Sequence, residues 1–401
     1  MMGGVAVEEQ VNRRRGGLFA LTALVLAALN LRLAVTSVGP VLAEIRAGLG
    51  MSAAVAGLLT SLPVVCFAVF GFAAPRLARR FGTSAVVAAG LSLLTLGLVV
   101  RAFVSGTALF VLLSGVAMAG IAVVNVLMPV VVKERFPDSV GTITGVYSVA
   151  LNVGATTAAA ATVPITGLLH GNWRLGLASW AVLAVAAVPA WLVLARDRPD
   201  RDRGAGPEPV GAVASVARSP VAWALALYFG LQSTSAYVIM GWLPQIYRDA
   251  GLSAELAGVL FAVTSFLGVP LTFAMAALVN RLPNQSGIAA VLGLFGIAGY
   301  AGLWYSPAAA PWLWAVLLGV VNCAFPLVLT MITLRGRTPA TVVRLSAFTQ
   351  GVGYLIAIPG PILVGVLHDV GGGWRLPLGL MVVLIVPQLI AGMFAGRDRY
   401  V

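Results

Sequence analysis

Twelve long apolar stretches, separated by short charged or Pro- and Gly-containing connections, constrain this chain more than any other feature. A helix needs about 20 apolar residues to cross the hydrocarbon core of a bilayer. The stretches run approximately over 18–43, 53–75, 83–101, 107–132, 141–169, 175–195, 220–247, 254–280, 287–305, 311–334, 343–367 and 376–396. None shows the alternating pattern of a membrane β-strand, about ten residues long. We therefore predict an all-α membrane protein with twelve transmembrane helices embedded in the lipid bilayer.

Composition excludes the other classes of protein. Only 9% of the 401 residues are charged and 60% are hydrophobic, whereas about 25% of the residues in a soluble domain are charged. The formal net charge of +12 taken alone suggests a polyanionic partner. In a membrane protein, however, the positions of Lys and Arg matter more than their sum. We therefore expect no nucleic-acid partner, and the soluble, disordered and fibrous classes are excluded.

The distribution of basic residues predicts the orientation in the membrane. An even number of spans puts both termini on one side, and 19 of the 25 Lys and Arg residues fall in the tails and loops of that side. Five fall in loops on the opposite side, namely Arg46, Arg101, Arg174, Arg248 and Arg375. Because cytoplasmic loops carry the excess of Lys and Arg, we predict a multi-pass protein of the cytoplasmic (inner) membrane with both termini in the cytoplasm.

The longest hydrophilic stretch, residues 196–219, mixes charge with Pro and Gly and has no periodic apolar pattern. This composition indicates a cytoplasmic linker. The predicted organisation is an N-terminal tail, a six-helix half, the linker, a second six-helix half and a C-terminal tail, over 1–17, 18–195, 196–219, 220–396 and 397–401.

One sequence offset relates the two halves to each other. An offset of 201 residues aligns SAAVAGLL at 52–59 with SAELAGVL at 253–260, Arg80 with Arg281, and WRL at 173–175 with WRL at 374–376. Because each half holds an even number of spans, the repeat is parallel, with its axis along the membrane normal. Two pseudo-symmetric halves related in this way enclose a central cavity and support transport by alternating access.

Arg32 belongs to neither side of the membrane. It lies about fourteen residues into the first span, roughly 21 Å along a helix, whereas all thirteen acidic residues lie in tails, loops or the ends of spans. A charge at that depth costs at least about 2.5–3.5 kcal/mol, and such a residue is a functional-site hypothesis by default. The guanidinium offers a rigid fork of donors suited to oxyanions. We expect it to bind an anion; the alternative is that helix-end carbonyls or water satisfy it.

Three polar residues accompany Arg32 on the first span. Thr36 lies one turn after Arg32, so both side chains can face the same cavity. Asn30 and Ser37 share a different face of the helix, where they are candidates for packing between helices. We include Asn30 and Thr36 among the candidate substrate-binding residues.

The architecture resembles the major facilitator superfamily over nearly the whole chain. The stretch from Gly71 to Arg80 is similar to that superfamily's loop signature, with Pro75 where an acidic residue usually stands and Ala78 in place of the second Gly. The departure removes the acid credited with charge pairing between helices and leaves the basic cluster intact. The resemblance assigns that cluster, Arg76, Arg79 and Arg80, to a gating loop, and a plain topogenic basic loop is the alternative.

The run Asn30-Leu31-Arg32, followed by Thr36-Ser37-Val38-Gly39-Pro40, looks like the first span of the cyanate permease and nitroimidazole-transporter branch of that superfamily. The resemblance implies the major facilitator fold and a transporter of small organic or inorganic compounds. It also implies that Arg32 touches the substrate.

Other polar residues inside the spans complete the set of candidates. In the superfamily, spans four and ten line the cavity, which selects Asn125 and Asn322. Spans five, seven and eleven contribute the remaining candidates Tyr147, Asn152, Gln232, Tyr237, Gln350 and Tyr354. Each of these side chains either contacts the ligand or forms hydrogen bonds between helices. The repeat maps Arg32 onto Ser233, so the expected site is asymmetric.

No nucleotide-binding, nucleophile or metal-binding motif is present, so we predict neither an enzyme nor a cofactor or metal site. The leading hypothesis is a secondary active or facilitative transporter of a small cyanate-like or carboxylate-like anion, working as a monomer. The alternative is a proton-coupled exporter of small aromatic or drug-like compounds. Gly145 and Gly154 lie at a spacing like that of the antiporter helix signature, but the Gly-Pro pair that should follow is missing.

Overall fold

The computed structural model describes residues 2–196, 216–279, 282 and 284–401. The N-terminal half holds α1 (Met2–Thr36), η1 (Gly39–Val41), α2 (Leu42–Leu49), α3 (Ala53–Phe81), α4 (Thr83–Arg101), α5 (Thr107–Arg135), η2 (Pro137–Ser139), α6 (Val140–Leu168), α7 (Trp173–Ser179) and α8 (Ala181–Arg196). The C-terminal half holds α10 (Pro220–Asp249), α11 (Ala254–Phe266), α12 (Gly268–Val279), α13 (Ser286–Tyr305), α14 (Pro311–Val321), α15 (Ala324–Arg335), α16 (Pro339–Ala357), α17 (Pro359–Gly371) and α18 (Arg375–Ala395).

The predicted fold class is confirmed, because the described chain is helical and its helices fall on the twelve expected spans. Eleven segments among the described residues are long and apolar enough to cross a membrane. The remaining expected span is α10, which has 30 residues. Its central polar run, Gln232 to Ser235, makes it less apolar than the others.

Several spans are built from two helices with a break between them. The tenth span divides into α14 and α15 at Asn322, and the eleventh divides into α16 and α17 beside Pro359. At the second of these breaks, Pro359 has no backbone N–H to continue the hydrogen-bond ladder, so one helix ends there and the next begins. Hydropathy alone predicts a continuous span and misses these breaks.

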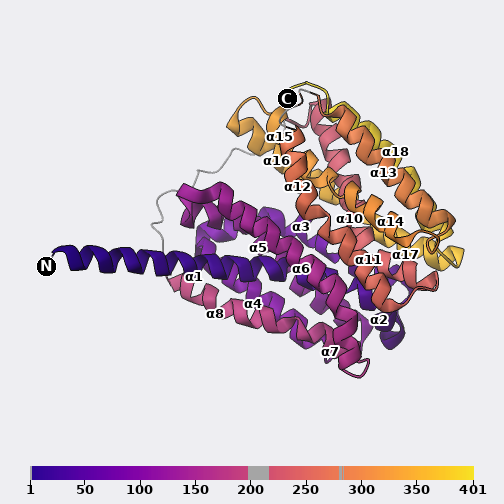
Figure 1. Cartoon of the computed structure of the whole chain (residues 1–401), viewed down its shortest axis with the longest axis horizontal. Coiled ribbons are helices and arrows are strands. Elements are labelled where there is room, and N and C mark those ends of the chain that lie inside the picture. Colours follow the sequence, from indigo (N-terminus) through magenta and orange to yellow (C-terminus); the bar gives the residue numbers. More distant parts are fainter. Residues whose placement is uncertain (1, 197–215, 280–281, 283) are drawn as a thin grey trace.

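The core is divided between the two ends of the bundle. We call the end at which α8 finishes and α10 begins the linker end, and the opposite end the far end. Near the linker end each half has its own apolar cluster, one formed by residues 20–194 and one by residues 216–395. At the far end a single cluster joins both halves, from Val38 of the first span to Ile385 of α18. The two halves are therefore fused at the far end, and their helices diverge toward the linker end (Figure 1).

Small residues let the halves approach closely at two equivalent seams. A Cβ atom built on Gly57 of α3 would stand 2.5 Å from the carbonyl oxygen of Pro361 in α17. A Cβ atom on Gly258 of α11 would stand 2.9 Å from the carbonyl oxygen of Ala159 in α6. The 201-residue offset relates Gly57 to Gly258. The repeat is thus expressed as paired helix crossings through small residues, as in membrane helix packing generally.

Only the α3–α17 seam carries ionic contacts beside its glycine, among the described residues. The Asp369 carboxylate accepts a hydrogen bond from the backbone N–H of Ala53 at 3.1 Å and lies 3.9 Å from Arg46. Nearby, the Arg248 guanidinium of α10 donates to both carboxylate oxygens of Glu44 at 2.7 and 2.9 Å. A carboxylate at a helix N-terminus is stabilised by the free N–H groups and the helix dipole. These contacts fasten the far end.

The beginnings of α3 and α11 reproduce the repeat in detail. Ser52 caps α3 by accepting from the N–H of Val55, and Ser253 caps α11 by accepting from the N–H of Leu256. Arg281, the expected equivalent of Arg80, lies outside the described residues, as do residues 197–215 of the expected linker.

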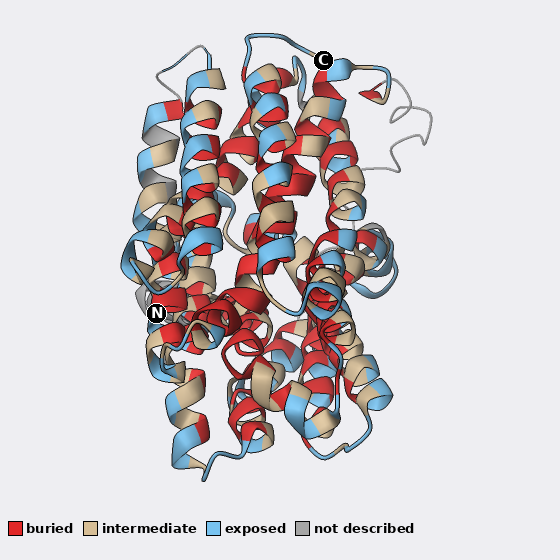
Figure 2. Ribbon diagram, turned by 90° about the vertical axis from the view of Figure 1, so that its right-hand side faces the viewer, coloured by how far each residue is buried: buried red, intermediate tan, exposed pale blue. Residues whose placement is uncertain are grey.

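The outer surface is apolar along much of its length. Buried residues gather where helices face one another, and exposed residues lie on the outward faces (Figure 2). The exposed side chains include large hydrophobic ones on both halves, such as Leu112, Val182, Leu294 and Val383. Exposed apolar area of this extent is what a bilayer covers.

Candidate functional site

Arg32 lies at the junction of the two halves. Its Nη1 is 3.8 Å from the sulfur of Met240 in α10, a weak acceptor on the opposite half. The ion pairs within the described part of the chain involve other arginines, namely Arg46, Arg248 and Arg335. No described carboxylate therefore neutralises the half-buried Arg32 guanidinium.

Tyrosine side chains from three further helices surround that guanidinium. Tyr147 of α6, Tyr237 of α10 and Tyr354 of α16 each interact electrostatically with Arg32. The Tyr147 hydroxyl donates to Oδ1 of Asn125 in α5 at 2.8 Å. We call these five residues the Arg32 group. All five are among the residues that the sequence predicts for the site, and the structure brings them together from both halves around one cation.

Aromatic rings give the Arg32 group an apolar wall. The Tyr354 ring stacks on Phe67 of α3, with centroids 5.3 Å apart, and meets Phe229 of α10 edge to face at 5.1 Å. The Phe67–Tyr354 pair joins the two halves. A planar ligand bound beside Arg32 would find ring faces as well as hydroxyl donors.

The two other candidates on the first span do not join this group through their side chains. Asn30 is buried and donates to the carbonyls of Leu26 at 2.7 Å and of Leu183 in α8 at 3.0 Å. Its amide therefore holds α1 against α8. The Thr36 hydroxyl donates to the backbone carbonyl of Arg32 at 2.8 Å, so it supports the helix that presents the guanidinium.

The polar side chains of α10 form hydrogen bonds with different neighbouring helices. Gln232 accepts a hydrogen bond from Nε2 of Gln388 in α18 at 2.8 Å, and its own Nε2 is buried without a partner among the described residues. Ser235 shares a 2.7 Å hydrogen bond with the Tyr300 hydroxyl of α13. In the break between α14 and α15, Oδ1 of Asn322 is likewise buried without a described partner.

Two candidates bond mainly within their own helices. Asn152 donates to the carbonyl of Ser148 at 2.9 Å, and a Cβ atom on Gly268 of α12 would stand 3.1 Å from its Oδ1. Asn152 thus lies where α6 meets the other half. Gln350 donates to the Ser346 hydroxyl at 2.8 Å.

The expected gating loop is helical in the structure. Arg76, Arg79 and Arg80 are exposed and lie in the last turns of α3, which continues to Phe81. Arg80 stacks over the Phe81 ring at 5.2 Å from its centroid. The connection to α4 is Gly82 alone, whose φ of +92° favours glycine because no Cβ clashes there. A run of basic residues resembles a loop in sequence but also forms a solvated helix end.

Arg101 is a buried cation that the sequence does not predict for the site. Its position at the edge of an apolar run indicates a loop on the far side instead. It ends α4 and its side chain is 1% exposed. Its Nη1 lies 3.4 Å from the Ser114 hydroxyl oxygen, while its Nε and Nη2 have no hydrogen-bond partner among the described residues. The signal in the sequence is that apolar residues, Ala102 to Val104, follow it directly.

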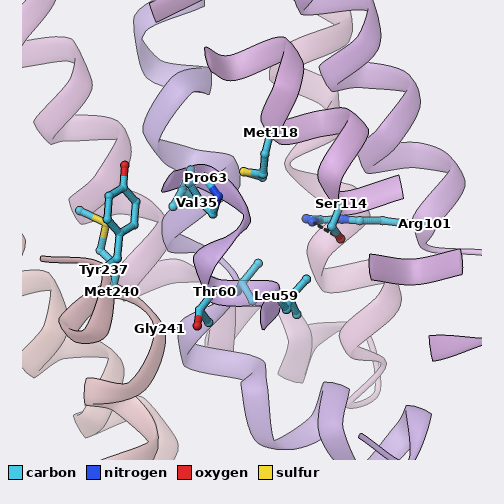
Figure 3. Close-up of a pocket in the computed structure, with 11 residues that line it drawn as sticks. Val35, Leu59, Thr60, Pro63, Arg101, Ser114, Met118, Tyr237, Met240 and Gly241 are labelled. Atoms are coloured by element: carbon cyan, nitrogen blue, oxygen red, sulfur yellow. Dashed lines mark hydrogen bonds between the residues drawn. The ribbon is translucent and has the colours of Figure 1, made fainter. Parts of the chain in front are cut away.

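The Arg101 guanidinium borders a small cavity on the far side of the Arg32 group. Figure 3 shows it pointing past Ser114 toward the other lining side chains. The lining comes from both halves and comprises Val35, Val38, Leu59, Thr60, Pro63, Arg101, Ser114, Met118, Tyr237, Met240 and Gly241. Tyr237 and Met240 thus face both Arg32 and the cavity. The chemistry of the region is that of two cations amid hydroxyls and apolar side chains.

Comparison with known proteins shows similarity along nearly the whole chain. The sequence profile described as Major Facilitator Superfamily matches residues 24–358. The uncharacterized transporter YycB of Bacillus subtilis (strain 168) is 34% identical, over 97% of this chain and 96% of its own. From Escherichia coli (strain K12), the 2-nitroimidazole transporter is 33% identical over 94% of this chain and 95% of its own. The cyanate transport protein CynX of the same organism is 33% identical over 95% and 98%.

Solved structures share the fold at low sequence identity. A bacterial homologue of the human lysosomal transporter Spinster superposes with a TM-score of 0.77 at 18% identity, covering 96% of this chain and 98% of that one. The nucleoside transporter NupG gives a TM-score of 0.75 at 13% identity, covering 94% of this chain and 98% of that one. The arrangement of helices described above is therefore a known one.

Proposed function

The chain belongs to the Major Facilitator Superfamily of membrane transporters, and on that premise we propose that it carries a small anion across the membrane by alternating access, with Arg32 as the ligand for the anion's charge. The observation that carries this proposal is a cation at the junction of the halves with no described carboxylate to neutralise it. Three tyrosines surround it instead.

Energetics favour a bound anion as the missing partner. An arginine inside a membrane span is costly, and guanidinium–oxyanion hydrogen bonds are among the strongest in proteins because both partners are charged. Hydroxyl donors such as that of Tyr237 can serve the remaining lone pairs of a carboxylate or of cyanate. The name of one relative, the cyanate transport protein, is consistent with such a cargo.

The arrangement of the halves supports the transport mechanism. One shared apolar cluster closes the far end, and each half has a separate cluster near the linker end. Rocking of one half against the other about the Arg32 group would exchange these two arrangements. The basic residues predict that both termini, and therefore the linker end, lie on the cytoplasmic side of the inner membrane. The state with the far end closed is then the inward-facing one.

The test is counterflow in proteoliposomes with cyanate, formate and benzoate, and with benzamide as the neutral counterpart of benzoate. We expect uptake of at least one anion and none of benzamide. Arg32→Ala should abolish uptake while the protein remains in the membrane, and Arg32→Lys should be a poor substitute because it loses the planar fork. Arg375→Ala, which removes an exposed arginine, is the matched control. Normal uptake by a well-folded Arg32→Ala variant would refute the proposal.

A second candidate function is proton-coupled export of small aromatic compounds. It is favoured by the aromatic wall formed by Phe67, Tyr354 and Phe229, and one relative is named a 2-nitroimidazole transporter. The same experiment separates the two functions. Benzamide flux that follows an imposed pH gradient and is unchanged in Arg32→Ala would support export of neutral aromatics.

A further inference from the structure

We propose that Arg101 forms a second anion-binding site, for the charged head of a small oxyanion such as a carboxylate or cyanate, on the far side of Arg32. This inference rests on the proposed function, which it extends from one site to two successive sites along the path. The ligand would pass between the two guanidinium groups during transport.

The Arg101 side chain is buried and has few hydrogen-bond partners. It is 1% exposed, so it is shielded from bulk solvent, and only one of its three guanidinium nitrogens has a described hydrogen-bond partner. That partner, the Ser114 hydroxyl, is neutral and distant at 3.4 Å. The Phe110 ring adds a cation–π contact at 5.8 Å, near the limit of such interactions. A buried charge is normally paired, and the two unpartnered nitrogens leave this guanidinium donor capacity for an anion.

The cavity that the Arg101 guanidinium borders is lined by side chains that also interact with Arg32. Met240 lines this cavity and its sulfur also contacts Arg32, and Tyr237 likewise belongs to both places. Figure 3 shows Tyr237 and Met240 on the opposite side of this cavity from Arg101, and the same two side chains interact with Arg32. The cavity is small and otherwise mostly apolar, which favours a compact anionic head over a bulky ligand.

The cavity lies beside the tightly packed residues that close the far end. Gly241 lines the cavity and is packed against Thr60 so tightly that a Cβ atom on it would stand 2.6 Å from the threonine methyl. Gly39 is pressed against the backbone of Met240 beyond it. The site is therefore sealed from the far end in this state. An anion that enters when the far end opens would reach it before Arg32.

The test measures stabilisation of the purified full-length protein against heat by formate and by cyanate. The variants are Arg32→Ala, Arg101→Met and the double variant. Because binding to the native state raises its stability, we expect each single variant to lose part of the anion-dependent rise in melting temperature. The double variant should lose all of it. Arg101→Lys, which keeps the charge, should retain part of the effect.

A second readout separates binding from packing. If Arg101 awaits a ligand, replacing it by Met of similar length removes an unpaired buried charge, and the melting temperature without anion should stay the same or rise. A clear fall there, with the anion effect intact, would make Arg101 a packing residue and overturn the inference. Equal anion effects in Arg32→Ala and the double variant would overturn it too, and would leave the proposed function standing. Full stabilisation of Arg32→Ala that is lost in Arg101→Met would refute Arg32 as the ligand but support the second site.

Discussion

The linker end and the far end of the bundle treat buried arginines in opposite ways. At the linker end, Arg335 is 2% exposed and is surrounded by acceptors. It donates to the carbonyls of Ala395 at 3.1 Å and Gly396 at 2.8 Å, and to the side-chain oxygen of Gln285. Toward the far end, Arg101 is as deeply buried but has one weak neutral partner.

Burial of a charge therefore does not by itself identify a binding residue. Arg335 closes the C-terminal end of α18, whose last carbonyls have no partners within the helix, and it ties them to the end of α15. Arg135 does the same at the end of α5, where it donates to the carbonyl of Leu194 in α8 at 2.9 Å. Saturated arginines fasten helices, whereas Arg32 and Arg101 keep donor capacity for something else.

Replacing a buried arginine by Met should change the free energy of unfolding at the linker end and leave it unchanged at the far end. Arg335→Met should leave two helix-end carbonyls and Gln285 without their donor, at a cost of about 3 kcal/mol or more because each buried unsatisfied group costs roughly 1–3 kcal/mol. Arg101→Met should show no loss. Thermal unfolding of the two purified variants without anion checks this prediction. A similar fall in melting temperature for both would erase the distinction between the two ends.

A smaller effect is expected from adding one methyl group along α3. In Gly57→Ala the new Cβ would stand 2.5 Å from the Pro361 carbonyl, so the far-end seam must shift, at about 1–3 kcal/mol. Gly71→Ala, toward the linker end of the same helix, meets open space and should be neutral. We expect Gly57→Ala to populate the far-end-open state more than wild type, and Gly71→Ala to match wild type.

The measurement is labelling of Thr60→Cys by a membrane-impermeant thiol reagent applied from the far side, because Thr60 is buried against Gly241 of α10 at the closed far end. The two native cysteines, Cys66 and Cys323, are both buried and are replaced by alanine in every variant. Faster labelling in Gly57→Ala than in Gly71→Ala supports the assignment of the far end as the closed one. Equal rates in the two variants would contradict it.

The fold could be predicted because a bilayer constrains each span to one length and one composition. Arg32 could be selected as a candidate as well, since a charge in the middle of an apolar run is rare and costly, and its role as a ligand stays a prediction. The side chains that contact Arg32 are known only from the structure. That Tyr237 faces Arg32 while Gln232 faces Gln388 depends on how α10 is rotated among its neighbours, and no single span encodes that rotation.

Two features could not be predicted for the same reason. The basic end of α3 and the buried end of α4 both carry arginine at the edge of an apolar run, and composition assigns both to loops. Arg79 is exposed and Arg101 is 1% exposed because one helix end projects into solvent and the other is covered by its neighbours, α5 among them. Tertiary packing decides between these outcomes.

Titration calorimetry of benzoate onto wild type, Arg32→Ala and Arg375→Ala tests whether Arg32 holds the charge of a transported anion. A charge-assisted hydrogen bond contributes about 1.5–3 kcal/mol, so Arg32→Ala should weaken binding about 10- to 100-fold while Arg375→Ala binds as wild type does. Equal affinity of benzoate for wild type and a folded Arg32→Ala variant would contradict this role of Arg32.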